Sequence, residues 1–405
     1  MERSYPRVTV SGKCERFIKS GHIWVYFDEI KNIDGAYENG DIVDVYTERG
    51  RFLGSGYIND YSKIRVRIIS KNANDRFDEA FYRRRVSYAL DYRLTVMGED
   101  FSSCRLIFGE ADSFPGLTVD KFEDILVVQV LSLGIERIKD MLFSILTEEL
   151  SRRGTKIRAI YERNDVKVRE LEGLTQFKGF YHAEGLRDDL DGIVRIKENG
   201  ILYDVDYMNG QKTGFFLDQK YNRLAVSKIA KDKRVLDCFT HTGAFALNAA
   251  RGASSVTAVD ISRSALDMAR HNAALNGFEN IDFVCADVFE LLTQMAGEKR
   301  QDYDMIILDP PAFTKSRDTV RSAERGYKEI NLKAMRLLKR GGYLATCSCS
   351  HFMRDDLFRK MLFSAAQDAG VSLRQIECRQ QCADHPILWG VEETDYLKFY
   401  IFQVV

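Results

Sequence analysis

The chain lacks the features that mark a membrane protein or a secreted one. None of its apolar runs is long enough to cross a bilayer, and its first residues, MERSYPRVTV, lack the apolar core of a signal peptide. Its 8 cysteines are scattered and form no paired CxxC motifs, which argues against a zinc site and against a disulfide framework. We therefore expect a cytoplasmic protein with no metal and no membrane partner.

An excess of charge of one sign is also absent. The chain has 59 Lys and Arg against 60 Asp and Glu, which gives a formal net charge of -1. Without a global cationic field, any binding of nucleic acid must depend on local basic patches. The length of 405 residues and the hydrophobic content of 45% predict two or three globular domains.

Glycine-rich phosphate-binding loops are missing too, in both the GxGxxG and the Walker form. The chain does contain a strand, turn and helix pattern in which a short apolar run ends at Asp237 and a turn with Gly243 precedes a helical run. A second strand, VTAVD, ends at Asp260, where an acidic residue is placed to bind both ribose hydroxyls of a nucleoside. A nucleoside site without a pyrophosphate cradle fits S-adenosylmethionine.

The patterns along the chain predict three domains. Residues 1–75 contain short alternating β-branched runs, typical of a small β domain, and residues 76–190 read as an α+β module. Residues 191–405 alternate strands with helices, which indicates a parallel sheet. The dipeptide Asn199-Gly200, between two alternating runs, predicts a hairpin turn at the entrance to the third domain.

Strands and helices in the third domain predict a Rossmann-like α/β fold with a mostly parallel sheet. Seven strands are expected, over residues 234–238, 255–260, 281–286, 303–309, 343–348, 371–378 and 396–404.

Two further segments are candidates for holding the methyl donor. GQKTGFFLDQKYNR, residues 210–223, would place Gln219 and Arg223 near the amino acid part of the donor, although a hairpin end followed by an amphipathic helix is the plainer interpretation. Asp287 follows the third strand and could accept a hydrogen bond from an adenine amino group. It could equally cap the next helix, and both roles can hold together.

The fourth strand ends in a carboxylate followed by two prolines. Asp309 comes after a fully apolar strand, and Pro310 and Pro311 stop the strand and stiffen the loop. Methylases of base amino groups typically carry an aromatic residue after two such prolines, whereas this chain has Ala312. The motif therefore favours methylation of carbon over methylation of an exocyclic amine.

A cysteine after the fifth strand supplies what carbon methylation needs. A pyrimidine C5 becomes nucleophilic when a thiolate adds at C6, and Cys349 is expected to be that nucleophile. Asp309 would hold N3 of the base protonated as general acid. Cys347 is interpreted as a small buried hydrophobe, and a metal site on this CxC pair lacks further ligands.

A basic helix is expected between these two strands. From Lys315 to Arg340 nine Lys or Arg stand against three Asp or Glu, while Ile330, Ala334 and Leu337 have helical spacing. The apolar face would be buried, and the cationic face would follow RNA phosphates beside Asp309. A plain solvated helix surface is the alternative.

Two weaker signals for RNA contact lie elsewhere. The strand KIRVRIIS would place Lys63, Arg65 and Arg67 on one face, where an ordinary solvated surface is favoured and an RNA-facing strand is the alternative. Trp389, in a loop after the sixth strand, is a candidate for stacking on a base.

Together these motifs resemble the bacterial 23S ribosomal RNA cytosine-C5 methyltransferase family. Its members join a PUA-like domain and a middle α+β domain to a class I methyltransferase domain, and the resemblance covers essentially the whole chain. It rests on residues 210–223, 235–249, 259–262, 287–289, 309–313, 325–331 and 346–350.

The resemblance implies transfer of a methyl group from S-adenosylmethionine to C5 of a cytosine in ribosomal RNA through a cysteine–C6 adduct. It gives Cys349 and Asp309 the catalytic roles and gives RNA binding to the N-terminal domain. The methyl donor would be bound by Gln219, Arg223, Asp237, Phe239, Thr240, Gly243, Asp260, Ile261, Asp287, Val288 and Asp309. The substrate would be bound by Pro310, Phe313, Lys315, Arg325 and Tyr327.

Three alternatives stay open at this point. An RNA uracil-C5 methyltransferase would use the same thiolate chemistry. A methyltransferase of small molecules would have no use for two extra domains or for the basic helix. A non-catalytic RNA-binding module would not need the set of Asp237, Asp260, Asp309 and Cys349. A homodimer is compatible with the sequence, which does not determine the oligomeric state.

Overall fold

The computed structural model describes residues 3–314 and 316–405, so Lys315, a predicted substrate-binding residue, lies outside the described residues. Contacts divide the chain into two compact units, and each unit is built from separate stretches of sequence. Unit 1 comprises the residues up to Ile196, Val205–Leu217 and Ala383–Thr394; unit 2 comprises Lys197–Asp204, Asp218–Cys382 and Asp395–Val405. Among the described residues, no helix is long and apolar enough to cross a membrane.

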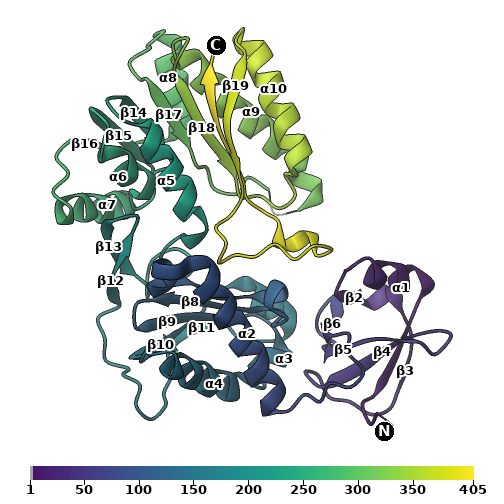
Figure 1. Ribbon diagram of the computed structural model, residues 1–405. Coiled ribbons are helices and arrows are strands. Elements are labelled where there is room, and N and C mark those ends of the chain that lie inside the picture. The colour runs from purple at the N-terminus through teal and green to yellow at the C-terminus, as the bar shows by residue number, and fades with distance from the viewer. Residues whose placement is uncertain (1–2, 315) are drawn as a thin grey trace. The chain divides into compact units, whose positions relative to one another are not determined.

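The first part of unit 1 is a six-stranded sheet, purple in Figure 1, with strand order β2-β6-β5-β4-β1-β3. Its elements are β1 (Arg7–Val10), α1 (Gly12–Lys19), β2 (Trp24–Tyr26), β3 (Ile30–Asp34), β4 (Ile42–Thr47), β5 (Phe52–Ile58) and β6 (Ile64–Ser70). The β runs expected within residues 1–75 are confirmed as strands, and KIRVRIIS forms β6. The alternating pattern of short strands was therefore a sound guide to this sheet.

The second part of unit 1 is a five-stranded sheet with order β11-β10-β9-β8-β7, and helices α2 and α4 pack together beside it (Figure 1). Its elements are α2 (Glu79–Met97), β7 (Ser103–Phe108), β8 (Leu117–Phe122), β9 (Ile125–Val130), α3 (Leu133–Glu136), α4 (Lys139–Arg152), β10 (Ala159–Asn164) and β11 (Phe177–Phe180). Strand β8 was not expected. Its Asp120 and Lys121 are charged yet buried. Their burial is tolerated because Asp120 pairs with Arg105 at 2.7 Å and Lys121 donates to backbone carbonyls.

Hairpin β12 (Ile193–Glu198) and β13 (Ile201–Asp206) turns at Asn199-Gly200, as expected. Asn199 has φ of 53° and Gly200 has φ of 82°. Positive φ at both central positions is what a tight two-residue hairpin turn requires, and Asn and Gly adopt it at the lowest cost.

Cations of strand β6 are paired with acidic groups of this chain. Arg67 donates to Glu172 at 2.7 Å and lies 3.7 Å from Glu110, so it joins the first sheet to turns that follow β10 and β7. Arg65 pairs with Asp60 at 2.6 Å. Both cations within β6 are therefore already paired, which favours the interpretation as an ordinary surface strand over an RNA-facing one.

A segment from late in the sequence completes unit 1. Val391 is buried in the same apolar cluster as the residues of the first sheet. Gly390 packs on Gly21 so closely that a Cβ on Gly21 would lie 2.6 Å from the Cα of Gly390. On this anchored segment Trp389 is 94% exposed, and base stacking remains its predicted role.

Arg93 on α2 is fully buried and ties this segment to the second sheet. Its guanidinium forms two bonds to the carboxylate of Asp112, at 2.5 and 2.8 Å. It also donates to the carbonyls of Arg105 and Asp384, both at 2.9 Å. A buried charge is stable only when it is paired and its donors are satisfied, and Arg93 meets both conditions.

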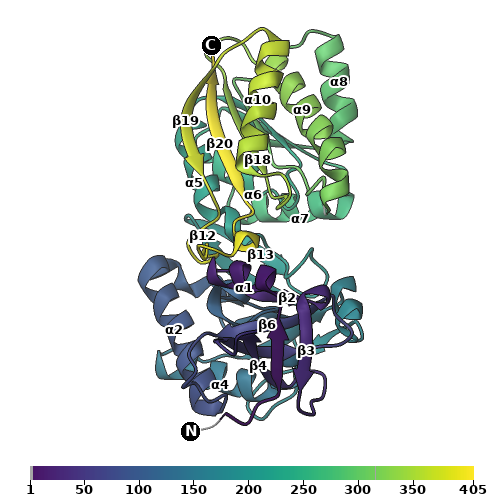
Figure 2. The same cartoon turned by 90° about the vertical axis from the view of Figure 1, so that its right-hand side faces the viewer.

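Unit 2 contains a seven-stranded sheet with order β16-β15-β14-β17-β18-β20-β19. Strand β20 runs antiparallel to both of its neighbours, β18 and β19, which are labelled in Figure 2, and the other pairs are parallel. Its strands are β14 (Arg234–Cys238), β15 (Ser255–Asp260), β16 (Ile281–Cys285), β17 (Met305–Leu308), β18 (Tyr343–Ser348), β19 (Leu373–Arg379) and β20 (Lys398–Val404). Its helices are α5 (Lys220–Ile229), α6 (Ala244–Ala250), α7 (Arg263–Leu275), α8 (Val288–Gly297), α9 (Val320–Leu337) and α10 (Asp355–Ala369). The predicted Rossmann-like fold is confirmed.

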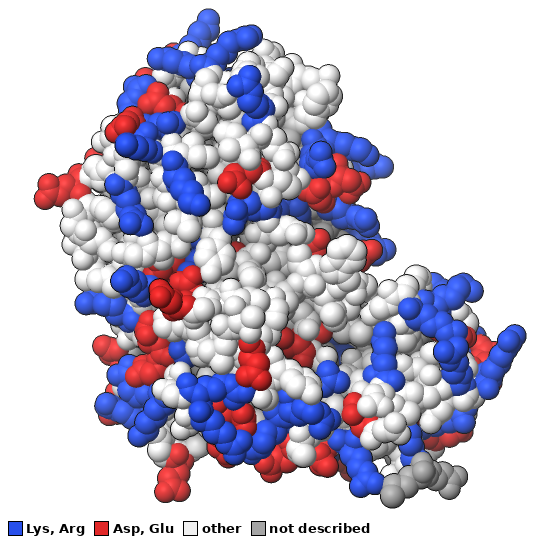
Figure 3. All heavy atoms as spheres, in the orientation of Figure 1, with Lys and Arg blue, Asp and Glu red and all other residues white. Residues whose placement is uncertain are grey.

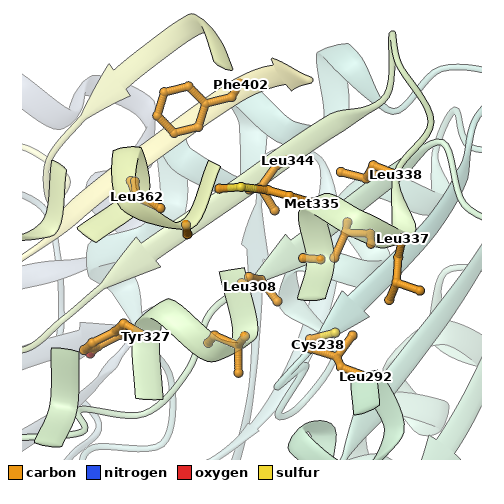
Figure 4. Packing of buried hydrophobic residues seen from close by; sticks show 14 of the residues in the cluster. Cys238, Leu292, Leu308, Tyr327, Met335, Leu337, Leu338, Leu344, Leu362 and Phe402 are labelled. Carbon is orange, nitrogen blue, oxygen red and sulfur yellow. The ribbon is translucent and has the colours of Figure 1, made fainter. Parts of the chain in front are cut away.

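Apolar side chains on both faces of this sheet hold it between helices. Helices α8, α9 and α10 cover one face, where Leu308 and Leu344 of the sheet pack against Tyr327 and Met335 (Figure 4). Helices α5 and α6 cover the other face. Burial on both faces explains why β17 is fully apolar up to Leu308, and why the next residue, Asp309, emerges at the edge of the sheet.

We predict that Arg93→Leu destabilises unit 1 by about 3–5 kcal/mol, because it leaves the nearly buried Asp112 carboxylate without its charged partner and with only the backbone N–H of Phe108 as a donor. Urea unfolding followed by tryptophan fluorescence measures this, since both tryptophans of the chain, Trp24 and Trp389, belong to unit 1. The control Arg84→Leu removes a half-exposed arginine and should cost less than about 1 kcal/mol. Equal costs for the two variants would contradict the prediction.

Candidate active site

The loop after β14 has an unusual backbone. Phe239, His241 and Gly243 have φ of 63°, 52° and 83°, and two of these residues are not glycine. Left-handed backbone is costly for residues with a Cβ, persists only where the surrounding structure enforces it, and is common at functional sites. Thr240 stabilises the loop by donating its hydroxyl to Asp237 at 2.6 Å.

Asp237 is buried beneath this loop with an incomplete set of partners. Its Oδ1 has no hydrogen-bond partner within the described part of the chain. Burial raises the pKa of Asp237 to about 8, so the carboxyl is mainly neutral near neutral pH. A buried polar atom that lacks a partner is a costly feature and often marks a place where a ligand binds.

Asp260 ends β15 and connects two loops. Its Oδ2 accepts from the backbone N–H of His241 at 2.8 Å, and its Oδ1 accepts from that of Ser262 at 2.9 Å. Each oxygen has a second lone pair available for a ribose hydroxyl. The next residue, Ile261, is 69% exposed and offers apolar surface to an adenine ring.

Asp287 caps helix α8, as predicted. Its Oδ1 accepts from the backbone N–H groups of Phe289 at 2.8 Å and Glu290 at 3.1 Å. Val288, a predicted cofactor residue, has its side chain in the core, so only its backbone could reach a ligand. The rings of Phe239 and Phe289 lie 6.3 Å apart, which brings the loops after β14 and β16 together.

Asp309 lies at the end of β17, beside β18. The parallel register pairs Leu308 with Thr346, which places Asp309 next to Cys347. Its Oδ1 accepts from the Cys347 thiol at 2.9 Å and from Nε2 of Gln219 at 3.1 Å. Burial raises the pKa of Asp309 to about 6, so this carboxyl retains its proton more readily than an ordinary aspartate.

The two cysteines of the CxC motif occupy different environments. Cys347 is 1% exposed, and burial together with Asp309 raises the pKa of its thiol. Cys349 is partly exposed, and its sulfur lies 3.9 Å from the carbonyl oxygen of Pro310. Cys349 is therefore the accessible thiol beside the Asp309 loop. The interpretation of Cys347 as a plain buried hydrophobe was incomplete, because its thiol hydrogen-bonds the Asp309 carboxyl.

Gln219 and Arg223 are both buried and held by other residues of unit 2. Arg223 forms a double hydrogen bond with Glu198, at 2.7 and 2.8 Å. Gln219 donates to Asp309 instead of facing open space. Direct contact of these two residues with the amino acid part of a methyl donor remains a prediction.

Residues expected on the substrate side divide into two groups. Phe313 is half-buried and Arg325 is exposed, so both are accessible, whereas Pro310 is buried. Tyr327 is fully buried, and its direct contact with substrate stays a prediction. Its ring packs 4.5 Å from that of Phe313 and its hydroxyl is 2.9 Å from the Ser350 hydroxyl, so it supports the loops of the site from beneath.

Lys398 at the start of β20 was not recognised from the sequence. Its buried ammonium donates to the carbonyls of Ser350 at 2.7 Å and Tyr396 at 2.8 Å, which holds the turn that follows Cys349. Burial lowers the pKa of Lys398 to about 8. The one available signal was a lysine at the head of an otherwise apolar strand, KFYIFQV.

Comparisons with known proteins agree with this geometry. A family model for a PUA-like domain matches residues 8–71, and one for an S-adenosylmethionine-dependent methyltransferase matches residues 177–402, which is more than half of the chain. The protein is thus an S-adenosylmethionine-dependent methyltransferase with a PUA-like domain.

Curated relatives narrow the family further. The chain is 41% identical over 388 residues to "Ribosomal RNA large subunit methyltransferase I" of Aeromonas salmonicida, covering 95% of this chain and 96% of that protein. It is 40% identical over 402 residues to the protein of the same name from Shewanella amazonensis, covering 98% and 99%. The chain belongs to the ribosomal RNA large subunit methyltransferase I family.

Solved structures support the fold alone. A Streptococcus mutans protein described as a SAM-dependent methyltransferase has a TM-score of 0.81 at 22% identity, covering 98% of this chain and 100% of that one. A methyltransferase solved in complex with SAH has a TM-score of 0.82 at 22% identity, with the same coverage.

The residues of the site fit S-adenosylmethionine. The unpartnered Oδ1 of Asp237, the fixed carboxylate of Asp260 and the exposed Ile261 are suited to an ammonium group, a ribose and an adenine. When bound, this cofactor supplies an electrophilic methyl group on a positively charged sulfur.

We predict that Asp237→Asn makes unit 2 less sensitive to pH while weakening cofactor binding. The ordinary aspartate pKa is about 3.9. Since the folded-state pKa is near 8, Asp237 contributes full stability below about pH 4, and this contribution is lost as pH rises toward 8. Asn keeps the neutral form, so the variant should lose less stability between about pH 5 and pH 8.

Hydrogen exchange of β14 peptides measures the stability, and calorimetry with SAH measures binding, which should weaken by about tenfold or more. The control Asp282→Asn changes an exposed carboxylate on β16 and should alter neither quantity. If the stability of the wild type and of Asp237→Asn depended on pH in the same way, the prediction would be contradicted, because Asp237 would then not be a group whose ionisation destabilises unit 2.

Proposed function

We propose that this protein transfers a methyl group from S-adenosylmethionine to C5 of a cytosine in large-subunit ribosomal RNA. The names of its relatives support ribosomal RNA as the substrate, and the residues of the site support methylation at carbon. The proposal depends on one observation: an accessible thiol, Cys349, lies beside the loop of a carboxyl with a raised pKa, Asp309, at one edge of the sheet. A cytoplasmic location would follow from this substrate.

The reaction uses these two groups in turn. The Cys349 thiolate adds to C6 of the base as Asp309 gives a proton to N3, which makes C5 nucleophilic. C5 then takes the methyl group as the bond from that methyl to sulfur breaks, leaving the demethylated cofactor. A base then takes the C5 proton, the Cys349 thiolate departs, and N3 returns its proton to Asp309, which releases the product.

The protonation state of Asp309 favours cytosine over uracil. N3 of cytosine carries no proton and needs a donor as the adduct forms, whereas N3 of uracil already bears one. A carboxyl with a pKa of about 6 is a better proton donor near neutral pH than an ordinary aspartate, which is almost wholly ionised there.

RNA phosphates would follow the first half of the basic helix. Arg317, Arg321 and Arg325 recur every fourth residue, are exposed, and form no ion pair within residues 3–314 and 316–405. Two later cations are already neutralised, since Lys328 pairs with Asp368 and Lys333 with Glu329. On the face in Figure 3, Lys and Arg are interspersed with Asp and Glu.

We predict that the wild type forms a covalent adduct with 23S RNA containing 5-fluorocytidine, because fluorine at C5 prevents the final proton loss. Cys349→Ala should abolish this adduct, and Cys285→Ala, which removes an exposed cysteine elsewhere, should retain it. Denaturing gels and mass mapping measure the result. An adduct formed with 5-fluorouridine and not with 5-fluorocytidine would assign the enzyme to uracil.

We also predict that Arg321→Gln and Arg325→Gln each weaken RNA binding and lower the slope of log affinity against log salt by about 0.7–0.9, the value for one lost phosphate contact. Filter binding over a range of salt concentrations measures both. Lys333→Gln serves as the matched control on the same helix, because its charge is already paired with Glu329. A loss as large in the control would contradict a specific phosphate path.

A further inference from the structure

Cys347 takes no part in the proposed reaction, yet its thiol contacts the Asp309 carboxyl directly. The sulfur lies 2.9 Å from Oδ1 of Asp309 and 3.4 Å from the carbonyl oxygen of Leu308. Burial favours the protonated thiol over the thiolate, so Cys347 acts as a hydrogen-bond donor here. A buried donor that hydrogen-bonds the proposed general acid can determine which of its carboxyl oxygens carries the proton.

A second donor reaches the same oxygen through a fixed chain of side chains. Nε2 of Gln219 donates to Oδ1 of Asp309 at 3.1 Å. The orientation of this amide is determined because its Oε1 accepts from Asn222 at 2.7 Å. Asn222 is oriented in turn by Arg379, whose Nε donates to its Oδ1 at 3.1 Å. The chain therefore permits only one orientation of the Gln219 amide.

We propose that Cys347 is a positioning residue: with Gln219 it occupies Oδ1 of Asp309, so that Oδ2 carries the proton given to the pyrimidine. No hydrogen bond to Oδ2 occurs among the described residues, and Asp309 is partly exposed. A carboxyl proton resides on the oxygen that is not already receiving donors, because two donors facing one oxygen would repel it. The identity of the proton acceptor rests on the proposed function.

The two cysteines of the CxC motif would have different roles. Cys349 is the accessible sulfur that would attack the base, and Cys347, two residues earlier in the strand, is the buried donor that orients the acid. Cys347 lies within β18 and Cys349 directly follows its last residue, Ser348, so the end of one strand supplies both sulfurs.

Other charged groups near Asp309 would remain unchanged in variants of Cys347. Asp218 raises the pKa of the Asp309 carboxyl, and Arg223 lowers it. Asp309 in turn raises the pKa of Asp237. Removing the thiol donor should therefore raise the Asp309 pKa above its value in the wild type, whereas a hydroxyl at position 347 should preserve it.

The test compares Cys347→Ala with Cys347→Ser in the full-length protein. Cys347→Ala should lower kcat by about tenfold, the scale of one hydrogen bond to a charged group, with the KM for RNA unchanged. The apparent pKa of Asp309 in the pH–rate profile should rise, and Cys347→Ser should restore both rate and profile. Both variants should still form the 5-fluorocytidine adduct. Cys104→Ala, which removes a buried thiol from unit 1, controls for loss of a core sulfur.

Two results would overturn the inference. A wild-type rate and pH profile in Cys347→Ala would make Cys347 a packing residue. An adduct lost in Cys347→Ala and retained in Cys349→Ala would make Cys347 the nucleophile.

Absence of an adduct in the wild type would instead refute the proposed reaction. In that case infrared difference spectra between the wild type and Asp309→Asn follow the Asp309 carboxyl without substrate. A higher titration midpoint of Asp309 in Cys347→Ala than in the wild type supports the positioning role without any assay of the reaction. An unchanged midpoint rejects that role.

Discussion

Parallel pairing of β17 with β18 is the constraint on which the site depends. The register that joins Leu308 to Thr346 brings Asp309 beside Cys347, and the same strand then delivers Cys349 to the loop at Pro310. Apolar packing on both faces of the sheet favours this register, because a shift by one residue would move every side chain of the strand to the opposite face and against the wrong helices. The carboxyl and the accessible thiol are thus placed by the core of unit 2.

The same core supports unfavourable features at the sheet edge. The loop after β14 has two non-glycine residues with left-handed backbone, and Asp237 is buried with one unpartnered oxygen. Asp309 and Lys398 carry shifted pKa values for the same reason, since each is partly or fully removed from water. Such costs are tolerated where rigid strands offset them, and they gather where a ligand with matching groups would relieve them.

Unit 1 is built from stretches far apart in the sequence. Residues 1–75 and 76–190, predicted as separate domains, contain separate sheets, and contacts group both with Ala383–Thr394, whose Val391 enters the first apolar cluster. Strand β8 was missed because buried Asp120 obscures its apolar pattern. Both results depend on partners distant in sequence, such as Arg105 for Asp120, and no local pattern reveals them.

Sequence alone was sufficient where the physical cause is local. The turn at Asn199-Gly200, the helix cap at Asp287 and the apolar strand before Asp309 each follow from a few adjacent residues, and the family motifs added the methyl donor. Tertiary structure alone decided that Cys347 bonds Asp309 while Cys349 stays accessible, that Arg223 pairs with Glu198, and that Tyr327 is buried. These outcomes depend on strand order and register, which bring together residues far apart in the sequence. Gln219 and Cys347, for example, are 128 positions apart.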